Sequence, residues 1–111
     1  MEETLRVNGF KNIPTSLKNL QIIEEIIGEL YPRFFELILL YSKHSFDPDE
    51  GVNNFERYIS SLTEIESSTI SIISRITQEK IYFYNLFLTF SGSRYLSDLV
   101  VKQPDIVEWL F

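Results

Sequence analysis

The stretch "FDPDEGVNNFERYISSL", residues 46–62, carries the clearest helix signal in the chain. Asp47 is placed to cap a helix, Pro48 fits its first turn, and Glu50 stands where a capping box needs a carboxylate. Apolar residues then recur three and four positions apart, at Val52, Phe55, Ile59 and Leu62. This spacing predicts an amphipathic helix with one buried face. Gly51 is a mild penalty within its first turn.

Two helices are predicted upstream of this stretch. The first is expected to begin near Thr15 or Ser16, just after Pro14, because apolar residues follow at spacings of three and four. The second covers residues 33–44, a run that is apolar nearly all round and follows Pro32. Its length favours a helix over a strand, and its composition predicts a central, mostly buried helix.

Two further helices are predicted downstream. Residues 63–77 place three isoleucines on one helical face, Ile70, Ile73 and Ile76. Their β-branched side chains also suit a strand, but a single strand would have no partner in this chain. Residues 78–90 predict another largely buried helix with two apolar stripes, one of Ile81, Tyr84 and Leu88 and the other of Phe83, Phe87 and Phe90.

A Gly-Ser corner introduces the closing stretch. Gly92 is expected to end the preceding helix as a left-handed cap, and Ser93 to cap the next one. The apolar face of that next helix is expected at Tyr95, Leu96, Leu99 and Val100. Pro104 and Asp105 suit the first turn of a last short helix, which turns three residues inward, Ile106, Trp109 and Leu110.

Together these patterns predict an all-α fold, an irregular bundle of five to six helices, several of them short. The chain of 111 residues has the length of one small domain, so residues 1–111 are expected to form a single helical domain. Because 44% of the residues are hydrophobic, the chain has enough apolar surface for a packed core.

Composition and charge exclude several classes of function. A net charge of −6 argues against a partner that is duplex nucleic acid or an anionic membrane surface, since both attract basic patches. The absence of cysteine excludes disulfides, thiolate zinc sites and cysteine nucleophiles. The N-terminal residues are polar, and the most apolar run, residues 34–41, is too short to cross a bilayer. We therefore expect a cytoplasmic location.

The residues offer no recognisable catalytic constellation. His44 stands at a helix end, where a cation stabilises the helix dipole or faces solvent rather than acting as a base. The acids from Asp47 to Glu50 resemble half a calcium loop, but helix capping accounts for them better. The turn at residues 91–93 lacks the acidic pair that would hold Mg²⁺ under phosphates. No catalytic, metal-binding or cofactor-binding residue is predicted in this chain.

Two segments carry a family resemblance. The stretch "GSRYLSDLVVKQPDIVEWL", residues 92–110, resembles the N-terminal region of the glutamine synthetase adenylyltransferases. The residues that match the family's pattern are Ser93, Tyr95, Leu96, Asp98, Leu99, Lys102, Pro104, Asp105 and Trp109. Gln103 stands where the family often has histidine. Upstream, "GVNNFERYISSL", residues 51–62, is similar to a helix of the same family at Asn54, Phe55, Glu56 and Arg57.

The resemblance implies a role in nitrogen regulation. Members of that family are long bifunctional enzymes that attach AMP to glutamine synthetase and remove it, under control of the regulator PII. Their Mg²⁺ and ATP bind in catalytic domains whose Gly-Ser and Asp-x-Asp motif lies downstream of the segments matched here. The chain is therefore expected to be a non-catalytic N-terminal module of a larger multidomain protein. Glutamine synthetase and PII are the implied partners.

One alternative and one further expectation remain. The alternative is a stand-alone cytoplasmic helical module that binds other proteins and has no enzymatic parent. The further expectation concerns the apolar end of the chain, formed by Trp109, Leu110 and Phe111. Large exposed apolar surfaces on soluble proteins mark interaction sites, so self-association through the C-terminal helix is expected.

Overall fold

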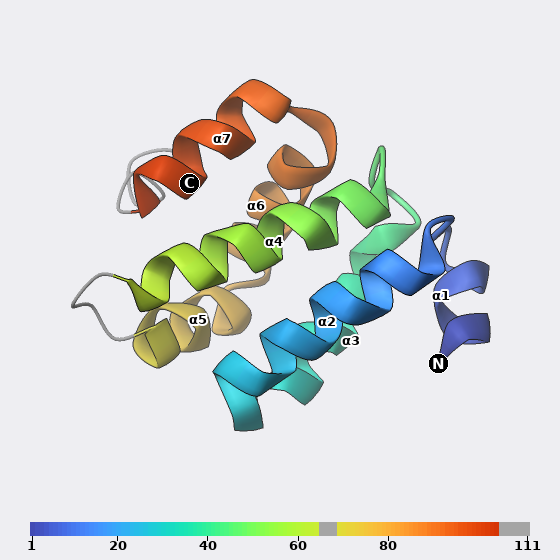
Figure 1. Ribbon diagram of the computed structural model, residues 1–111, viewed down its shortest axis with the longest axis horizontal. Helices are drawn as coiled ribbons and strands as arrows, with labels where there is room; N and C mark the ends of the chain where they lie inside the picture. The colour runs from blue at the N-terminus through green and yellow to red at the C-terminus, as the bar shows by residue number, and fades with distance from the viewer. Residues whose placement is uncertain (65–68, 105–111) are drawn as a thin grey trace.

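The computed structural model describes residues 1–64 and 69–104, which form an all-α bundle without a strand among them (Figure 1). The predicted all-α fold is confirmed. Along the chain the elements are α1 (Glu2–Val7), α2 (Ile13–Ile27), the 3-10 helix η1 (Gly28–Leu30), α3 (Tyr31–Ser42), α4 (Pro48–Thr63), α5 (Thr69–Gln78), α6 (Lys80–Gly92) and α7 (Arg94–Lys102).

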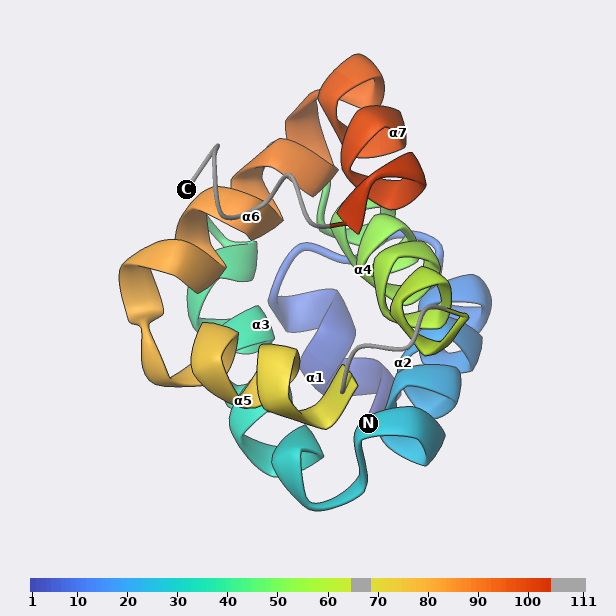
Figure 2. The same ribbon diagram turned by 90° about the vertical axis from the view of Figure 1, so that its left-hand side faces the viewer.

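The central element of the bundle is α4. It packs against α2 and α6 and also contacts α7. In both views α5 and α7 lie on opposite sides of it (Figures 1 and 2). Its predicted start is confirmed, because the Asp47 carboxylate accepts a hydrogen bond from the backbone N–H of Glu50 at 3.2 Å. The Glu50 carboxylate, predicted to reach back toward Asp47, accepts from Asn54 at 3.2 Å further along the helix.

A cluster of aromatic rings joins α4 to α3 and α6. The ring of Phe55 lies 5.1 Å from Phe34 and 5.0 Å from Phe90, edge to face in both cases. It also stacks on Phe83 at 5.1 Å and lies 6.1 Å from Phe87. Edge-to-face and offset-stacked arrangements suit the quadrupoles of aromatic rings, and buried rings supply much of a core's apolar area. Phe55 therefore stands at the centre of the core.

Gly51 permits the close approach of α4 and α6. A Cβ atom at this position would lie 2.5 Å from Cε1 of Phe87, closer than real side chains come. The glycine that carries a small penalty in the helix pattern is thus required by the packing of the neighbouring helix.

The N-terminal part of the chain differs from the expectation in two ways. α1 had no counterpart in the apolar pattern, yet it buries Leu5. α2 begins at Ile13, ahead of the predicted start at Thr15 or Ser16, and takes Pro14 into its first turn. Proline is tolerated there because the first N–H groups of a helix have no partner within the helix.

α3, expected to be central and mostly buried, is buried along one side. The buried residues of α3 are Phe34, Leu37, Ile38 and Ser42, while Leu40 is exposed. α6 shows the same asymmetry: the stripe of Phe83, Phe87 and Phe90 is buried, whereas Ile81 of the other stripe is exposed. α6 is apolar nearly all round, so its pattern does not identify the buried face, whereas in α3 the exposed pair of Arg33 and Glu36 marks part of the outer side.

The corner between α6 and α7 confirms one expected cap and corrects the other. Ser93 caps α7, because its hydroxyl accepts a hydrogen bond from the N–H of Leu96 at 3.2 Å. Gly92 is the last residue of α6 and has no positive φ, so the expected left-handed cap was wrong. The expected last helix after Pro104, with Trp109 and the self-association assigned to it, lies outside the described residues.

Gly51→Ala is expected to destabilise the protein by about 1–3 kcal/mol, because the added methyl group meets the ring of Phe87 in a filled core. Urea unfolding of the variant measures this loss. Gly92→Ala is the matched control: a Cβ there meets nothing within 4 Å. That variant is expected to be as stable as the wild type or slightly more stable. Equal stability for both variants would refute the packing role of Gly51.

Tyr31 predicts a loss of stability at alkaline pH. Burial, and secondarily the carboxylate of Glu24, raises the pKa of its phenol from 10.0 to about 12. Above pH 10 the unfolded chain releases this proton more readily than the folded chain. The contribution of Tyr31 to the free energy of unfolding is therefore complete below pH 10. It is lost as the pH rises toward 12. Urea unfolding at about pH 9 and about pH 11 measures the loss of unfolding free energy between the two pH values. This loss should be smaller in Tyr31→Phe than in the wild type. Tyr95→Phe, at an exposed position, serves as the control.

Candidate functional site

A polar stripe runs along the side of α4 that faces α7. Its members are Asn54, Arg57 and Ser61, which share one side of the helix because they are three and four positions apart. They contact Phe90 of α6 and two residues of α7, Asp98 and Val101. We call these six residues the α4–α7 seam.

Asn54 is the buried residue of the seam, with only 1% of its surface exposed. Its amide nitrogen donates a hydrogen bond to the backbone carbonyl of Phe90 at 2.8 Å. The last carbonyls of a helix have no partner within the helix, and Phe90 lies in the last turn of α6. Asn54, from the neighbouring helix α4, therefore supplies the hydrogen-bond donor that this carbonyl at the end of α6 lacks. Its side-chain oxygen accepts a hydrogen bond from Arg57 at 2.8 Å.

Arg57 and Asp98 form the ion pair of the seam. Nη1 of Arg57 lies 3.0 Å from Oδ1 of Asp98, and the same nitrogen bonds Asn54. The two side chains are 41% and 45% exposed, so water screens the pair. Pairs of this kind contribute about 0.2–1 kcal/mol. The pair orients α7 on α4 more than it stabilises the fold.

Two serines complete the contacts of α7. The Ser61 hydroxyl donates to the carbonyl of Val101 at 2.8 Å, in the last turn of α7. The Ser97 hydroxyl donates to the carbonyl of Thr89 at 3.1 Å, at the end of α6. The first bond satisfies a carbonyl that the end of α7 leaves without a partner in its own helix, and the second is an additional bond to a carbonyl that already accepts from the N–H of Ser93.

The structure places the sequence-derived site residues in different environments. It brings Asn54, Arg57 and Asp98 together in the seam. The others are not part of it: Phe55 lies in the core, Glu56 accepts from Ser60, Ser93 caps α7, Leu99 is half-buried and Pro104 is buried. Trp109 lies outside the described residues.

The expected inward face of α7 was wrong at Tyr95 and Leu96. Tyr95 is 76% exposed and Leu96 is 37% exposed, whereas the buried residues of α7 are Ser97 and Val100. The physical reason is the hydrogen bond of Ser97, which turns its side of the helix toward the end of α6. Tyr95 comes two residues earlier, about 200° around the helix, so it points outward.

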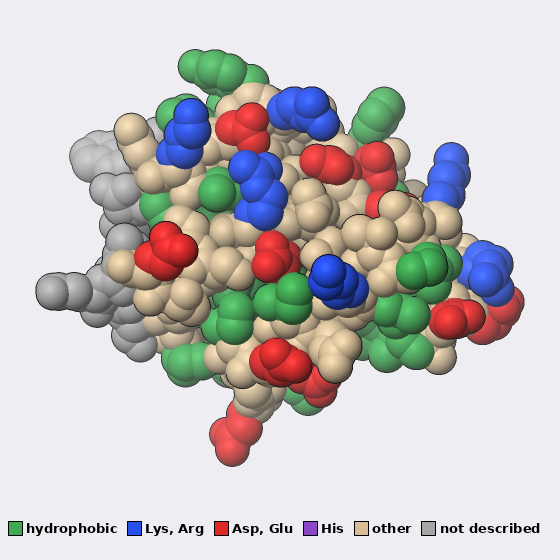
Figure 3. Space-filling view, viewed as in Figure 1, with side chains coloured by type: hydrophobic (Ala, Val, Ile, Leu, Met, Phe, Trp, Pro, Cys, Tyr) green, Lys and Arg blue, Asp and Glu red, His purple; other side chains and the backbone are tan. Residues whose placement is uncertain are grey.

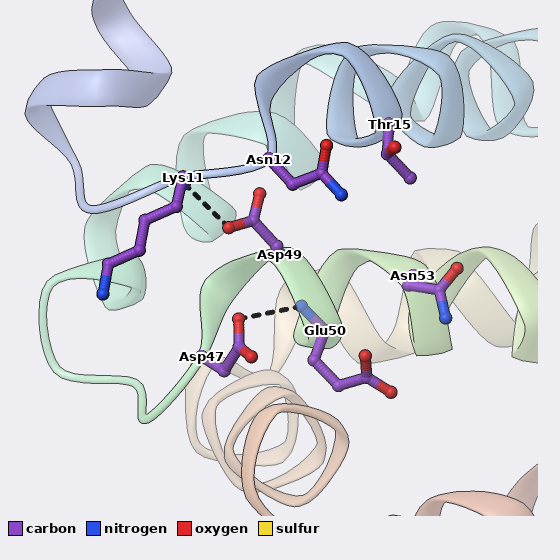
Figure 4. A pocket seen from close by; sticks show the side chains of 7 residues that line it. All are labelled: Lys11, Asn12, Thr15, Asp47, Asp49, Glu50 and Asn53. Atoms are coloured by element: carbon purple, nitrogen blue, oxygen red, sulfur yellow. Dashed lines mark hydrogen bonds between the residues drawn. The ribbon is translucent and has the colours of Figure 1, made fainter.

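A hollow of about 460 Å³ lies between the first turns of α2 and α4 (Figure 4). Asp49 joins its two sides: the carboxylate accepts from the N–H of Lys11 at 2.8 Å and from the hydroxyl of Ser16 at 2.6 Å. The Lys11 amine extends away from that carboxylate (Figure 4). Asp47 and Asp49 thus cap and connect helices. No group of three metal-binding side chains occurs within residues 1–64 and 69–104.

The chemistry of the seam is that of a joint between helices. Its polar groups pair with one another, and no buried side-chain nitrogen or oxygen of the described residues lacks a hydrogen-bond partner. The surrounding surface mixes charges: Figure 3 shows acidic and basic side chains interspersed, with hydrophobic side chains between them. Among the helices described, none is long and apolar enough to cross a membrane.

Sequence reasoning missed Ser61 and Ser97. Ser61 could have been found from the polar spacing of three and four that it shares with Asn54 and Arg57. Ser97 gave no such signal, because its burial depends on a carbonyl of another helix.

Asn54→Ala is expected to destabilise the protein by about 1–3 kcal/mol, because it leaves the carbonyl of Phe90 buried without its donor. Urea unfolding measures the effect. Asn53→Ala is the neighbouring control, since that half-buried amide makes one long bond with Asn19, 3.3 Å in length. It should lose less than about 1 kcal/mol. A larger loss at Asn53 than at Asn54 would contradict the role given to the seam.

Comparisons with known proteins add no assignment to this geometry. No protein-family model, no curated protein and no solved structure matches the chain. A proposal of function therefore rests on the residues themselves and on the resemblance in two of their segments.

Proposed function

We propose that this chain is a non-catalytic helical module like the N-terminal region of the glutamine synthetase adenylyltransferases, and that it supports reversible AMP transfer to glutamine synthetase. One observation carries the proposal. Arg57 belongs to one segment of the resemblance and Asp98 to the other, 41 positions away, yet their side chains meet. Asn54 joins them through Arg57. Asn54, Arg57 and Asp98 thus form one contact network, which gives the two segments a common structural task.

That task is to hold the corner between α6 and α7 on α4. The seam and the hydrogen bond of Ser97 orient α7 so that Tyr95 and Leu96 face outward. In a multidomain enzyme, such a face is suited to contact the deadenylylating domain or to position glutamine synthetase. Mg²⁺ and ATP would act in the catalytic domains of the parent. PII, the second implied partner, has no assigned surface on this chain.

A stand-alone cytoplasmic interaction module is the second candidate. It is favoured by Phe46, which is 89% exposed on the loop between α3 and α4, together with Tyr95. Exposed aromatic side chains are common anchors of protein interfaces. The reading frame separates the candidates. Coding sequence that continues into a Gly-Ser and Asp-x-Asp segment supports the first, and a stop codon directly after Phe111 supports the second.

The purified chain is expected to bind glutamine synthetase and to transfer no AMP. Sedimentation of the mixture measures binding. Intact mass of glutamine synthetase after incubation with ATP and Mg²⁺ measures transfer. With adenylylated glutamine synthetase, phosphate and Mg²⁺, no ADP should appear. The expectation of no transfer follows from the sequence, which lacks both a nucleotide loop and a metal-binding acidic pair.

Tyr95→Ala should weaken the complex about tenfold, the scale of an aromatic anchor at an interface. Ile81→Ala, which also removes an exposed apolar side chain, is the control and should leave binding unchanged. Absence of binding, or equal effects of the two substitutions, would count against the proposed contact face. Transfer activity that disappears on mutation of this chain would show that the module is catalytic.

A further inference from the structure

α7 is attached to the bundle by less apolar contact than the helices beside it. α6 completely buries four large apolar side chains, Phe83, Leu86, Phe87 and Phe90. In α7 the completely buried side chains are Val100 and the polar Ser97. Burial of apolar surface is the main favourable contribution to folding. The hydrophobic effect therefore holds α7 less firmly than it holds α6.

Apart from Val100 and the partly buried Val101, the attachments of α7 that the described residues show are polar. The Arg57–Asp98 pair is open to water, with both side chains more than a third exposed. The hydroxyls of Ser61 and Ser97 donate hydrogen bonds to carbonyls, and water can donate to the same carbonyls when α7 is detached. Because water replaces such bonds on opening, their net contribution to stability is small.

The connection to α6 suits a hinge. Ser93 has extended backbone angles, φ −130° and ψ 105°, between two helices. At Gly92 a Cβ would meet nothing within 4 Å, so the chain has space there. Hinges are short segments at element ends that absorb changes in φ and ψ. On its outer side α7 exposes Tyr95 and Leu96 to solvent.

We propose that α7 is a strap that opens from α4 as a unit, turning about Gly92 and Ser93, while α2 to α6 stay folded. Opening exposes Val100 and the surfaces of α4 and α6 that α7 contacts. Surface that α7 covers in the closed bundle is thus accessible in the open state alone. Segments with few buried apolar contacts open locally at a lower free energy than the global unfolding. The proposal goes beyond the proposed function and holds for either candidate.

Two valines provide a matched test. Val100 in α7 and Val52 in α4 are both 0% exposed, and the natural chain contains no cysteine. Val100→Cys and Val52→Cys are separately exposed to Ellman's reagent under native conditions. If α7 opens locally, the thiol at position 100 reacts at least about tenfold faster than the thiol at position 52. Equal rates, both matching the rate of global unfolding, would overturn the proposal. If Val100→Cys does not fold, Ser97→Cys, at another buried position of α7, replaces it.

The ion pair provides the second test. Asp98→Asn should accelerate labelling at position 100 by about two- to fivefold, the range for a partly exposed pair, and leave position 52 unchanged. Glu36→Gln is the control, because it removes the Arg33–Glu36 pair, which lies within α3 and connects no two helices. It should change neither rate. Equal acceleration at both positions by Asp98→Asn would mean that the pair stabilises the whole fold and would contradict a separate strap.

Discussion

The contact between Gly51 and Phe87 sets the distance between α4 and α6, and the rest of the bundle depends on that distance. The missing side chain lets the ring of Phe87 occupy the space where a Cβ would stand. One turn further along α4, Phe55 then reaches the rings of Phe83 and Phe90. The same approach brings Asn54 to the carbonyl of Phe90. The aromatic core and the α4–α7 seam therefore both depend on the contact between α4 and α6.

The side-chain caps at the starts of α4 and α7 were predictable from the sequence, and the choice of buried faces was not. Asp47 and Ser93 cap helices as expected, because a cap is decided by residues within one turn of it. α6 has apolar residues on nearly every side, so its sequence does not select the buried face. α1 is one helical turn and a half, too short for a periodic signal.

The residues of the candidate site likewise divide into those that the sequence identified and those whose positions depend on contacts between helices. The resemblance identified Asn54, Arg57 and Asp98 as residues of interest, and the structure brings them together. It also identified Tyr95, whose outward position follows from the burial of Ser97 against the end of α6. A buried serine is unfavourable in any pattern based on hydrophobicity. Burial of Ser97 is favourable here because its hydroxyl finds an acceptor, the carbonyl of Thr89 in another helix, which a single helix sequence does not reveal.

The buried amide of Asn54 has a consequence for the alignment of the helices. Two apolar helix faces can slide past each other by one turn and still bury similar area. A slip of one turn would separate Asn54 from the carbonyl of Phe90 and leave that carbonyl buried without its donor. An apolar residue at this place would leave the carbonyl of Phe90 without its donor and would not distinguish one alignment from another. The amide thus selects one alignment of α6 on α4, a contribution to structural specificity that is separate from its contribution to stability.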